Sequence, residues 1–333
     1  MLVVREDPAK KGILYAGTQF GLFISLNDGA TWTPFKSNLP VTPITDIKIH
    51  QDDLVMSTMG RGFWILDNLM SLRGISEIGN QSMVFFDTKP AIRNMMSAQP
   101  ETNGPEYPRA GAKLDYYLAE NQEGLRLELL NTKGQVVRTF KADAPKGEKV
   151  DTSRNMSTEF TEAPASSGLP NKAGMNHFSW NMQHQGGWDK EPKRSYTGSG
   201  PMVSTGVYTA RLISGDTVLE EKFDVVLDPR VTLVTDADVA EQELLTLKIQ
   251  TFRNEVDQLI AVIEKEVEAL KLVIEKESPS KKIARKKSEL ETIYNQLVTE
   301  EGTYMQPMLE DQARYLDSML GQADQKPGQD AYE

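Results

Sequence analysis

The feature that most constrains the fold is a long helical periodicity near the C-terminal end of the chain. Apolar side chains recur there with steps of 4, 3, 4, 3, 4, 4, 3 and 4 residues, at Leu245, Ile249, Phe252, Val256, Leu259, Ile263, Val267, Leu270 and Ile274. This spacing places them on one side of an α-helix, in a near-heptad seam. We expect one helix of about 35 to 40 residues that buries the seam against another helix. Asp238 and Glu241 are expected to form a capping box at its start.

The apolar periodicity resumes after a short break, at Ile283, Leu290, Ile293 and Leu297. Ser278 suits a helix N-cap and Pro279 suits the first helical position. Two seams joined by so short a turn predict an antiparallel helical hairpin, and residues 304–320 are expected to form a third helix. The basic run at 281–287 is interpreted as a solvated helix face paired with acidic residues of the first helix.

Composition excludes several classes of protein. The 333 residues suggest roughly two or three domains, and the net charge of −11 argues against a nucleic-acid-binding protein. From Val231 onward there are 21 acidic and 12 basic residues, so most of the excess acid lies there. The chain has no cysteine, which excludes disulfides, thiolate nucleophiles and cysteine-based zinc sites. No apolar run reaches the roughly 18 residues that a transmembrane helix needs, and the first residues do not resemble a signal peptide.

Short β-strands are expected in the two regions that precede the helices. Residues 1–76 contain five apolar or aromatic runs separated by turn residues, among them Asn27–Gly29, which is a strong hairpin signal. Residues 77–232 contain seven such runs, which predict an immunoglobulin-like or fibronectin III-like β-sandwich. Two polar stretches, 142–172 and 189–201, are predicted to be long loops. With a helical region at 233–333, the expected protein has three modules.

The sequence "SLNDGATW", Ser25 to Trp32, resembles the Asp-box, or bacterial neuraminidase repeat, whose pattern is S-x-D-x-G-x-T-W. Ser25, Gly29, Thr31 and Trp32 match it, whereas Asn27 stands in the usual aspartate position with Asp28 beside it. The flanking segments resemble the last blade of the β-propeller in large exported bacterial proteins of the BNR-repeat or sortilin-like type. In that family the motif T-H-G-R-G is usual, and Met59 replaces its histidine here.

This resemblance implies a partial Asp-box propeller, an Ig-like sandwich and a C-terminal antiparallel helical bundle. Since a propeller needs several blades, the resemblance also implies that the chain is a C-terminal fragment, or a short protein whose blade is completed by a partner. The expected partners are therefore the missing blades, another protein chain, a second copy or a glycan. No targeting signal is recognised in the sequence, but the resemblance to this family suggests an exported protein.

Candidate site residues are few. The turn at Ser25–Trp32 is interpreted as a structural staple, with a calcium loop as the alternative. Arg61 and Asp67 are candidates for side chains that face a propeller channel. Trp188 and Tyr196 lie in a polar loop and are candidates for stacking on a ligand. His50, His177 and His184 are scattered without a metal-binding motif, so no metal or cofactor is expected.

Three functions follow as hypotheses. The first is a non-catalytic binding or assembly region of a BNR-repeat propeller protein. The second is the accessory part of a sialidase-like glycoside hydrolase whose catalytic blades lie upstream. Hydrolysis by this chain alone is disfavoured, because no cluster of arginines is visible. The third is a carbohydrate-binding β-sandwich.

Overall fold

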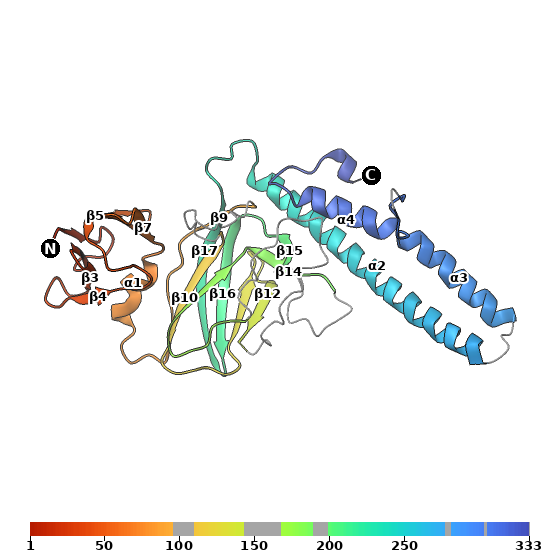
Figure 1. Ribbon diagram of the computed structural model, residues 1–333, viewed down its shortest axis with the longest axis horizontal. Helices are drawn as coiled ribbons and strands as arrows, with labels where there is room; N and C mark the ends of the chain where they lie inside the picture. The colour runs from red at the N-terminus through yellow and green to blue at the C-terminus, as the bar shows by residue number, and fades with distance from the viewer. Residues whose placement is uncertain (96–109, 143–167, 189–198, 277–280, 303–304, 333) are drawn as a thin grey trace.

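The computed structural model describes residues 1–95, 110–142, 168–188, 199–276, 281–302 and 305–332. The protein is β-rich, with several sheets followed by a C-terminal helical region. A small β region at the N-terminus is followed by a larger one, and the helices project away from the larger one as an arm (Figure 1). Most of the two predicted loops, together with Ser278 and Pro279, lie outside the described residues.

The first β region consists of two antiparallel sheets in chain order. One has four strands, β1 (Val3–Glu6), β2 (Leu14–Thr18), β3 (Gly21–Ser25) and β4 (Thr33–Phe35). The other has three strands, β5 (Ile44–His50), β6 (Asp53–Thr58) and β7 (Phe63–Leu66). The five strands predicted from the sequence are confirmed, and β1 and β4 are additional. Helix α1 (Met70–Gly74) and a 3-10 turn, η1 (Ile75–Glu77), close the region.

One apolar core lies between these two sheets. Tyr15 and Ile24 from the first sheet and Ile47 and Leu54 from the second are buried in it. The sheets approach each other closely at Gly17, where a Cβ atom would lie 2.9 Å from the backbone oxygen of Ile44. Any larger residue at that position would push β2 away from β5, so the glycine permits the packing.

The second β region also has a single core between two main sheets. The strands are β8 (Met83–Phe85), β9 (Ala91–Arg93), β10 (Ala112–Leu118), β11 (Arg126–Leu130), β12 (Val136–Lys141), β13 (Gly174–Trp180), β16 (Gly206–Ser214) and β17 (Thr217–Leu227). One sheet has the order β13-β10-β8 and the other β12-β11-β16-β17-β9, where β9 pairs in parallel with β17. A separate hairpin is formed by β14 (Gln183–Gln185) and β15 (Ser199–Met202). The seven predicted strands are confirmed; β9, β14 and β15 are additional.

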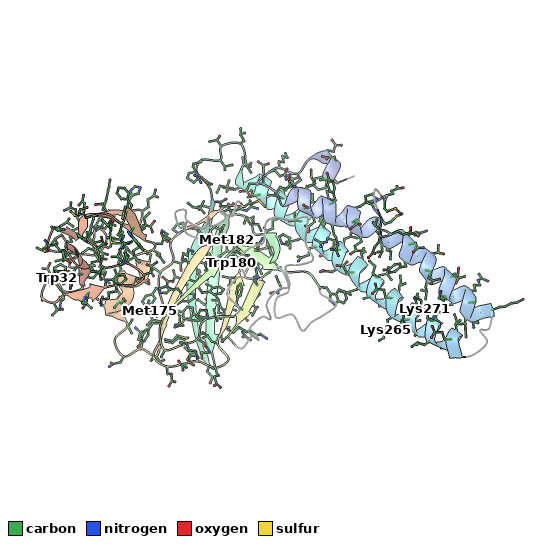
Figure 2. All side chains as sticks on the ribbon, in the orientation of Figure 1. Trp32, Met175, Trp180, Met182, Lys265 and Lys271 are labelled. Carbon is green, nitrogen blue, oxygen red and sulfur yellow. The ribbon has the colours of Figure 1, made fainter. Side chains whose placement is uncertain are left out.

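The core of this region explains the sequence pattern on β11. Leu127 and Leu129 alternate with polar residues and are fully buried. Trp180, which Figure 2 labels beside Met182, is also fully buried and packs against Tyr208 and Phe223. Its indole N–H donates to the carbonyl of Gln183 over 3.0 Å, so the buried ring leaves no polar atom unsatisfied.

The helical region contains α2 (Asp236–Lys276), α3 (Lys281–Leu297), α4 (Leu309–Leu320) and the short turn η3 (Gln329–Ala331). The 41-residue α2 confirms the predicted long helix. It packs against α3 in its C-terminal half and against α4 in its N-terminal half (Figure 1). The third helix begins at Leu309 rather than at residue 304.

Two details of the predicted helix are wrong. The seam against α3 contains Ile260, whereas Leu259 is exposed, and Phe252 is also exposed. The reason is that α2 changes its partner from α4 to α3 along its length, so the buried stripe does not follow one heptad register.

The capping box at the start of α2 is also formed by other residues than predicted. Thr235 and Asp238 form it, since Asp238 Oδ2 accepts from the Thr235 N–H at 2.9 Å and Thr235 Oγ1 accepts from the Asp238 N–H at 3.3 Å.

Candidate functional site

The turn at residues 25–32 is held by its own side chains. Asn27 Oδ1 accepts from the Thr31 N–H at 2.8 Å, and its Nδ2 donates to Thr31 Oγ1 at 2.8 Å. Ser25 Oγ accepts from the Gly29 N–H at 2.9 Å. Asp28 and Gly29 have φ angles of 58° and 84°, the left-handed conformation that Asn, Asp and Gly tolerate. Asn27 Oδ1 therefore accepts from the turn amide as an aspartate oxygen would, whereas its Nδ2 donates a bond that an aspartate could not.

The side chains of Asp28 and Trp32 make none of these hydrogen bonds. Trp32 is partly exposed at the end of the turn, next to Gly29 (Figure 2). The described residues contain no group of three or more His, Asp or Glu side chains placed to hold a metal ion. Among the described residues, Asp28 is therefore not part of a set of side chains that could bind calcium.

The outer face of the β5–β6–β7 sheet carries exposed apolar side chains along β7, while polar residues of β5 and β6 occupy the rest of that face. On β7, Trp64 and Leu66 pack into the core between the sheets, whereas Phe63 and Ile65 point to the opposite side and are 80% and 56% exposed. Val55 lies beside Ile65 in the register of β6 and β7, and Met59 is exposed in the turn before Phe63. We call Val55, Met59, Phe63 and Ile65 the β7 face.

Arg61 and Asp67 lie at opposite ends of β7 and are not brought together. Arg61 is exposed in the turn before the strand, where its carbonyl accepts from Trp64 Nε1 at 3.0 Å. Asp67 follows the strand, and its pKa is raised by partial burial and by the neighbouring carboxylate of Asp53. The two candidate side chains are therefore not placed in one site.

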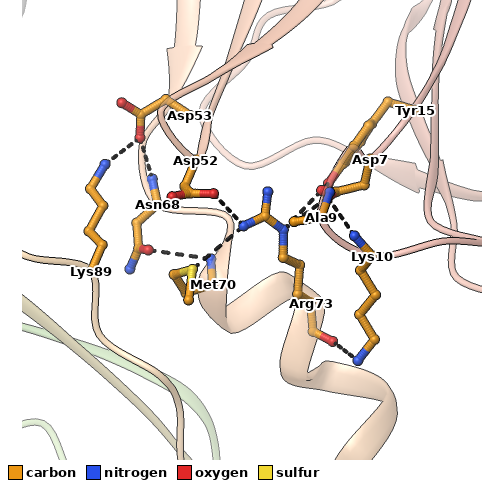
Figure 3. Close-up of polar contacts among 10 residues, drawn as sticks. All are labelled: Asp7, Ala9, Lys10, Tyr15, Asp52, Asp53, Asn68, Met70, Arg73 and Lys89. Atoms are coloured by element: carbon orange, nitrogen blue, oxygen red, sulfur yellow. Dashed lines mark hydrogen bonds and ion pairs between the residues drawn. The ribbon is translucent and has the colours of Figure 1, made fainter. Parts of the chain in front are cut away.

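A buried ionic network joins α1 to both sheets of the first β region (Figure 3). Arg73 Nε contacts both oxygens of the fully buried Asp7 carboxylate at 3.1 Å, and Arg73 Nη1 contacts Asp52 at 2.5 Å. The Tyr15 hydroxyl donates to Asp7 at 2.7 Å. Burial opposes ionisation of Asp7, but the hydrogen bonds from Tyr15 and Arg73 outweigh it and lower the pKa of Asp7.

A second polar cluster joins the two β regions. Asn68 Nδ2 donates to Asp115 Oδ2 at 3.1 Å, and Lys89 pairs with Asp53 at 2.7 Å. His177 Nδ1 lies 2.9 Å from Asp115 Oδ1, and this hydrogen bond raises the pKa of His177. Neither cluster could be found from the sequence because, apart from Tyr15 and Asp7, the partners are 21 to 66 residues apart along the chain.

The loop residue Trp188 is held against helix α2. Its backbone N–H donates to Asn254 Oδ1 at 2.7 Å, and its side chain lines a pocket between the β14–β15 hairpin and the helices. Tyr196, the other predicted stacking residue, lies outside the described residues. The three histidines are apart: His184 Nε2 contacts Glu243 at 2.5 Å, His177 contacts Asp115, and His50 is exposed at the end of β5.

The basic run on α3 makes ion pairs both within its helix and across the hairpin. Lys286 contacts Glu266 of α2 at 2.7 Å. Arg285 and Lys287 pair with acidic residues one turn further along α3. In the part of the chain that is described, no helix is long and apolar enough to cross a membrane.

Comparison with known proteins gives only weak likenesses. No protein-family model and no curated protein matches the chain. Among solved structures, PorZ of Porphyromonas gingivalis, described as an essential bacterial surface component of the type-IX secretion system, is similar with 14% identity and a TM-score of 0.20, over 67% of this chain and 22% of PorZ. CopC from Methylosinus trichosporium OB3b is similar with 13% identity and a TM-score of 0.16, over 36% of this chain and 79% of CopC. At these TM-scores neither similarity defines a fold or a function.

Proposed function

We propose that this chain is a non-catalytic binding and assembly region of a larger propeller-type protein, and that the β7 face is the surface through which it assembles. The observation that carries the proposal is the exposure of Phe63 and Ile65 on β7, the edge strand of a sheet whose opposite face packs into the core. Large apolar side chains grouped on an exposed edge strand favour association with another surface.

The energy available at this face is substantial. Burial of a phenylalanine or isoleucine side chain contributes about 1.5–3 kcal/mol for each residue. The partly exposed Val55 and the exposed Met59 extend the same surface. A neighbouring sheet, supplied by the same protein or by another chain, would therefore gain affinity mainly from apolar contact.

The proposal includes three modules, at residues 1–76, 77–232 and 233–333. In it, the two sheets of the first module are blades, the turn at Ser25–Trp32 is the Asp-box staple of one of them, and the second module is an Ig-like sandwich. Separate apolar cores on either side of residue 77 support the first boundary. Export of the protein remains a prediction that rests on the resemblance of the turn and its flanks.

Sedimentation velocity of the full chain at increasing concentration tests the assembly surface. We expect self-association that Phe63→Ser with Ile65→Ser abolishes, because the two serines remove the apolar contact. The matched control is Phe20→Ser, since Phe20 is 75% exposed but lies in the turn between β2 and β3. A wild-type chain that stays monomeric, or a double variant that associates as before, would contradict the proposal.

A further inference from the structure

A pocket of about 440 Å³ opens between the β14–β15 hairpin and helices α2 and α4. Its volume lies in the range of about 300–1,000 Å³ that is typical of small-molecule sites. The hairpin contributes Gly187 and Trp188 from the segment that follows β14, and α2 contributes Gln250, Arg253 and Asn254. Figure 1 shows the hairpin directly beside α2.

The segment that follows β14, which carries Trp188, is hydrogen-bonded to helix α2. Besides the bond from Trp188 to Asn254, Gln250 Nε2 donates to the carbonyl of Gln185 at 3.0 Å. A Cβ atom on Gly187 would lie 2.7 Å from Asn254 Oδ1, so the hairpin backbone is already in close contact with α2. The indole of Trp188, which is 39% exposed, is therefore presented by a supported backbone.

Each arginine of the lining is paired with a carboxylate, which belongs to the lining only in the case of Asp317. Arg93 contacts Asp324, Arg253 contacts Asp317 and Arg314 contacts Glu310. Asp257 adds a further acidic group to the wall. A pocket in which each guanidinium has a carboxylate partner offers no excess positive charge, which argues against a phosphate, sulfate or carboxylate ligand.

The remaining groups are suited to hydroxyls and to a flat apolar surface. Asn254 uses its Oδ1 for Trp188 and Gln250 uses its Nε2 for Gln185, so an amide NH₂ and an amide oxygen have no partner within the described residues. The negative face of an indole attracts weakly positive C–H groups, such as those on one side of a pyranose ring. We propose that this pocket binds a neutral saccharide, with Trp188 stacked on the sugar ring and the amides of Gln250 and Asn254 bonded to its hydroxyls. The site is independent of the β7 face.

The test is binding of the labelled full chain to an array of neutral cello-, malto-, chito-, manno- and galacto-oligosaccharides, together with sulfated and sialylated glycans. We expect binding to at least one neutral series, followed by solution titration with the best binder. Trp188→Ala should weaken that binding at least tenfold, because the stacking surface is lost. Asn254→Asp keeps the oxygen that accepts from Trp188 but removes the NH₂ donor, and should weaken binding several-fold.

Phe20→Ala is the matched control, since it removes an exposed aromatic ring far from the pocket and should leave binding unchanged. Thermal unfolding of each variant shows whether the fold is retained, and Trp188→Phe provides a milder change that keeps a ring. The proposal is overturned if no neutral glycan binds, if only sulfated or sialylated glycans bind, or if folded Trp188→Ala and Asn254→Asp variants bind as wild type does.

Discussion

At the scale of single residues, the buried pair of Arg73 and Asp7 joins helix α1 to the first sheet. Arg73→Met would leave the buried Asp7 carboxylate without its counter-charge. We expect a loss of about 3–5 kcal/mol in the free energy of unfolding, measured by urea denaturation. Arg211→Met is the control, because Arg211 pairs with Glu220 at the surface and its loss should cost about 1 kcal/mol or less. Similar costs for the two variants would contradict the structural role of Arg73.

His177 gives a pH dependence of known sign. Its pKa is raised above the usual value of 6.5 by the bond to Asp115. A raised folded pKa stabilises the protein below the unfolded pKa, and this stabilisation is lost as the pH rises through the folded pKa. We expect wild type to exceed His177→Gln in unfolding free energy by more at about pH 5.5 than at about pH 8.5. Since the His177 side chain is largely exposed, the change should be below about 1 kcal/mol. A difference that is the same at both pH values would show that the bond does not contribute.

Contacts between residues close together in the chain could be predicted from the sequence, whereas contacts between residues far apart in the chain could not. Asn27 and Thr31 are four residues apart, and the turn pattern alone placed them in one hairpin connection. Arg73 gave no such signal, because Asp7 lies 66 residues away and an arginine on a short helix is usually solvated. The pocket around Trp188 was missed for the same reason: Gln250 and Asn254 belong to another element and read as ordinary surface positions of a helix.

At the scale of elements, the start of α2 depends on the box formed by Thr235 and Asp238. Thr235→Ala removes a side-chain oxygen that accepts from the Asp238 N–H, and we expect a loss of about 1 kcal/mol in urea denaturation. Thr251→Ala is the matched control. Thr251 is exposed in the middle of the same helix and bonds only to the carbonyl of Leu247, so its replacement should be neutral or slightly stabilising. An equal loss for both variants would contradict the cap.

Periodicity predicted which segments are helices and strands, but not every register. The apolar steps in α2 were sufficient to establish a long helix. They did not distinguish Leu259 from Ile260, because adjacent residues on a helix differ by only a fraction of a turn and the choice depends on where α3 lies. Short strands such as β9 and β14 were missed because each has three residues and is ordered by its neighbours.

At the scale of the whole molecule, the order of the strand-rich and helical regions along the chain could be predicted from composition and from the spacing of apolar residues. The contacts that join the regions could not. Arg93 on β9 illustrates this: it is buried beneath the helical region, where Gln242 and Asp324 surround it, and burial lowers its pKa to about 10. The β7 face makes the proposed assembly of the first β region with another surface testable.

Site-directed spin labelling tests most directly whether the β7 face becomes covered on assembly. Because the chain has no cysteine, a single introduced cysteine can be labelled specifically. A nitroxide spin label on Ile65→Cys reports whether this position becomes covered, and the same label on Val218→Cys, a residue of β17 with similar exposure, is the control. As the concentration of the full chain rises, we predict that the electron paramagnetic resonance spectrum of the label at 65 becomes immobilised, whereas that at 218 does not change. A label at 65 that stays mobile at every concentration, or equal immobilisation at both positions, would contradict the β7 face as the assembly surface.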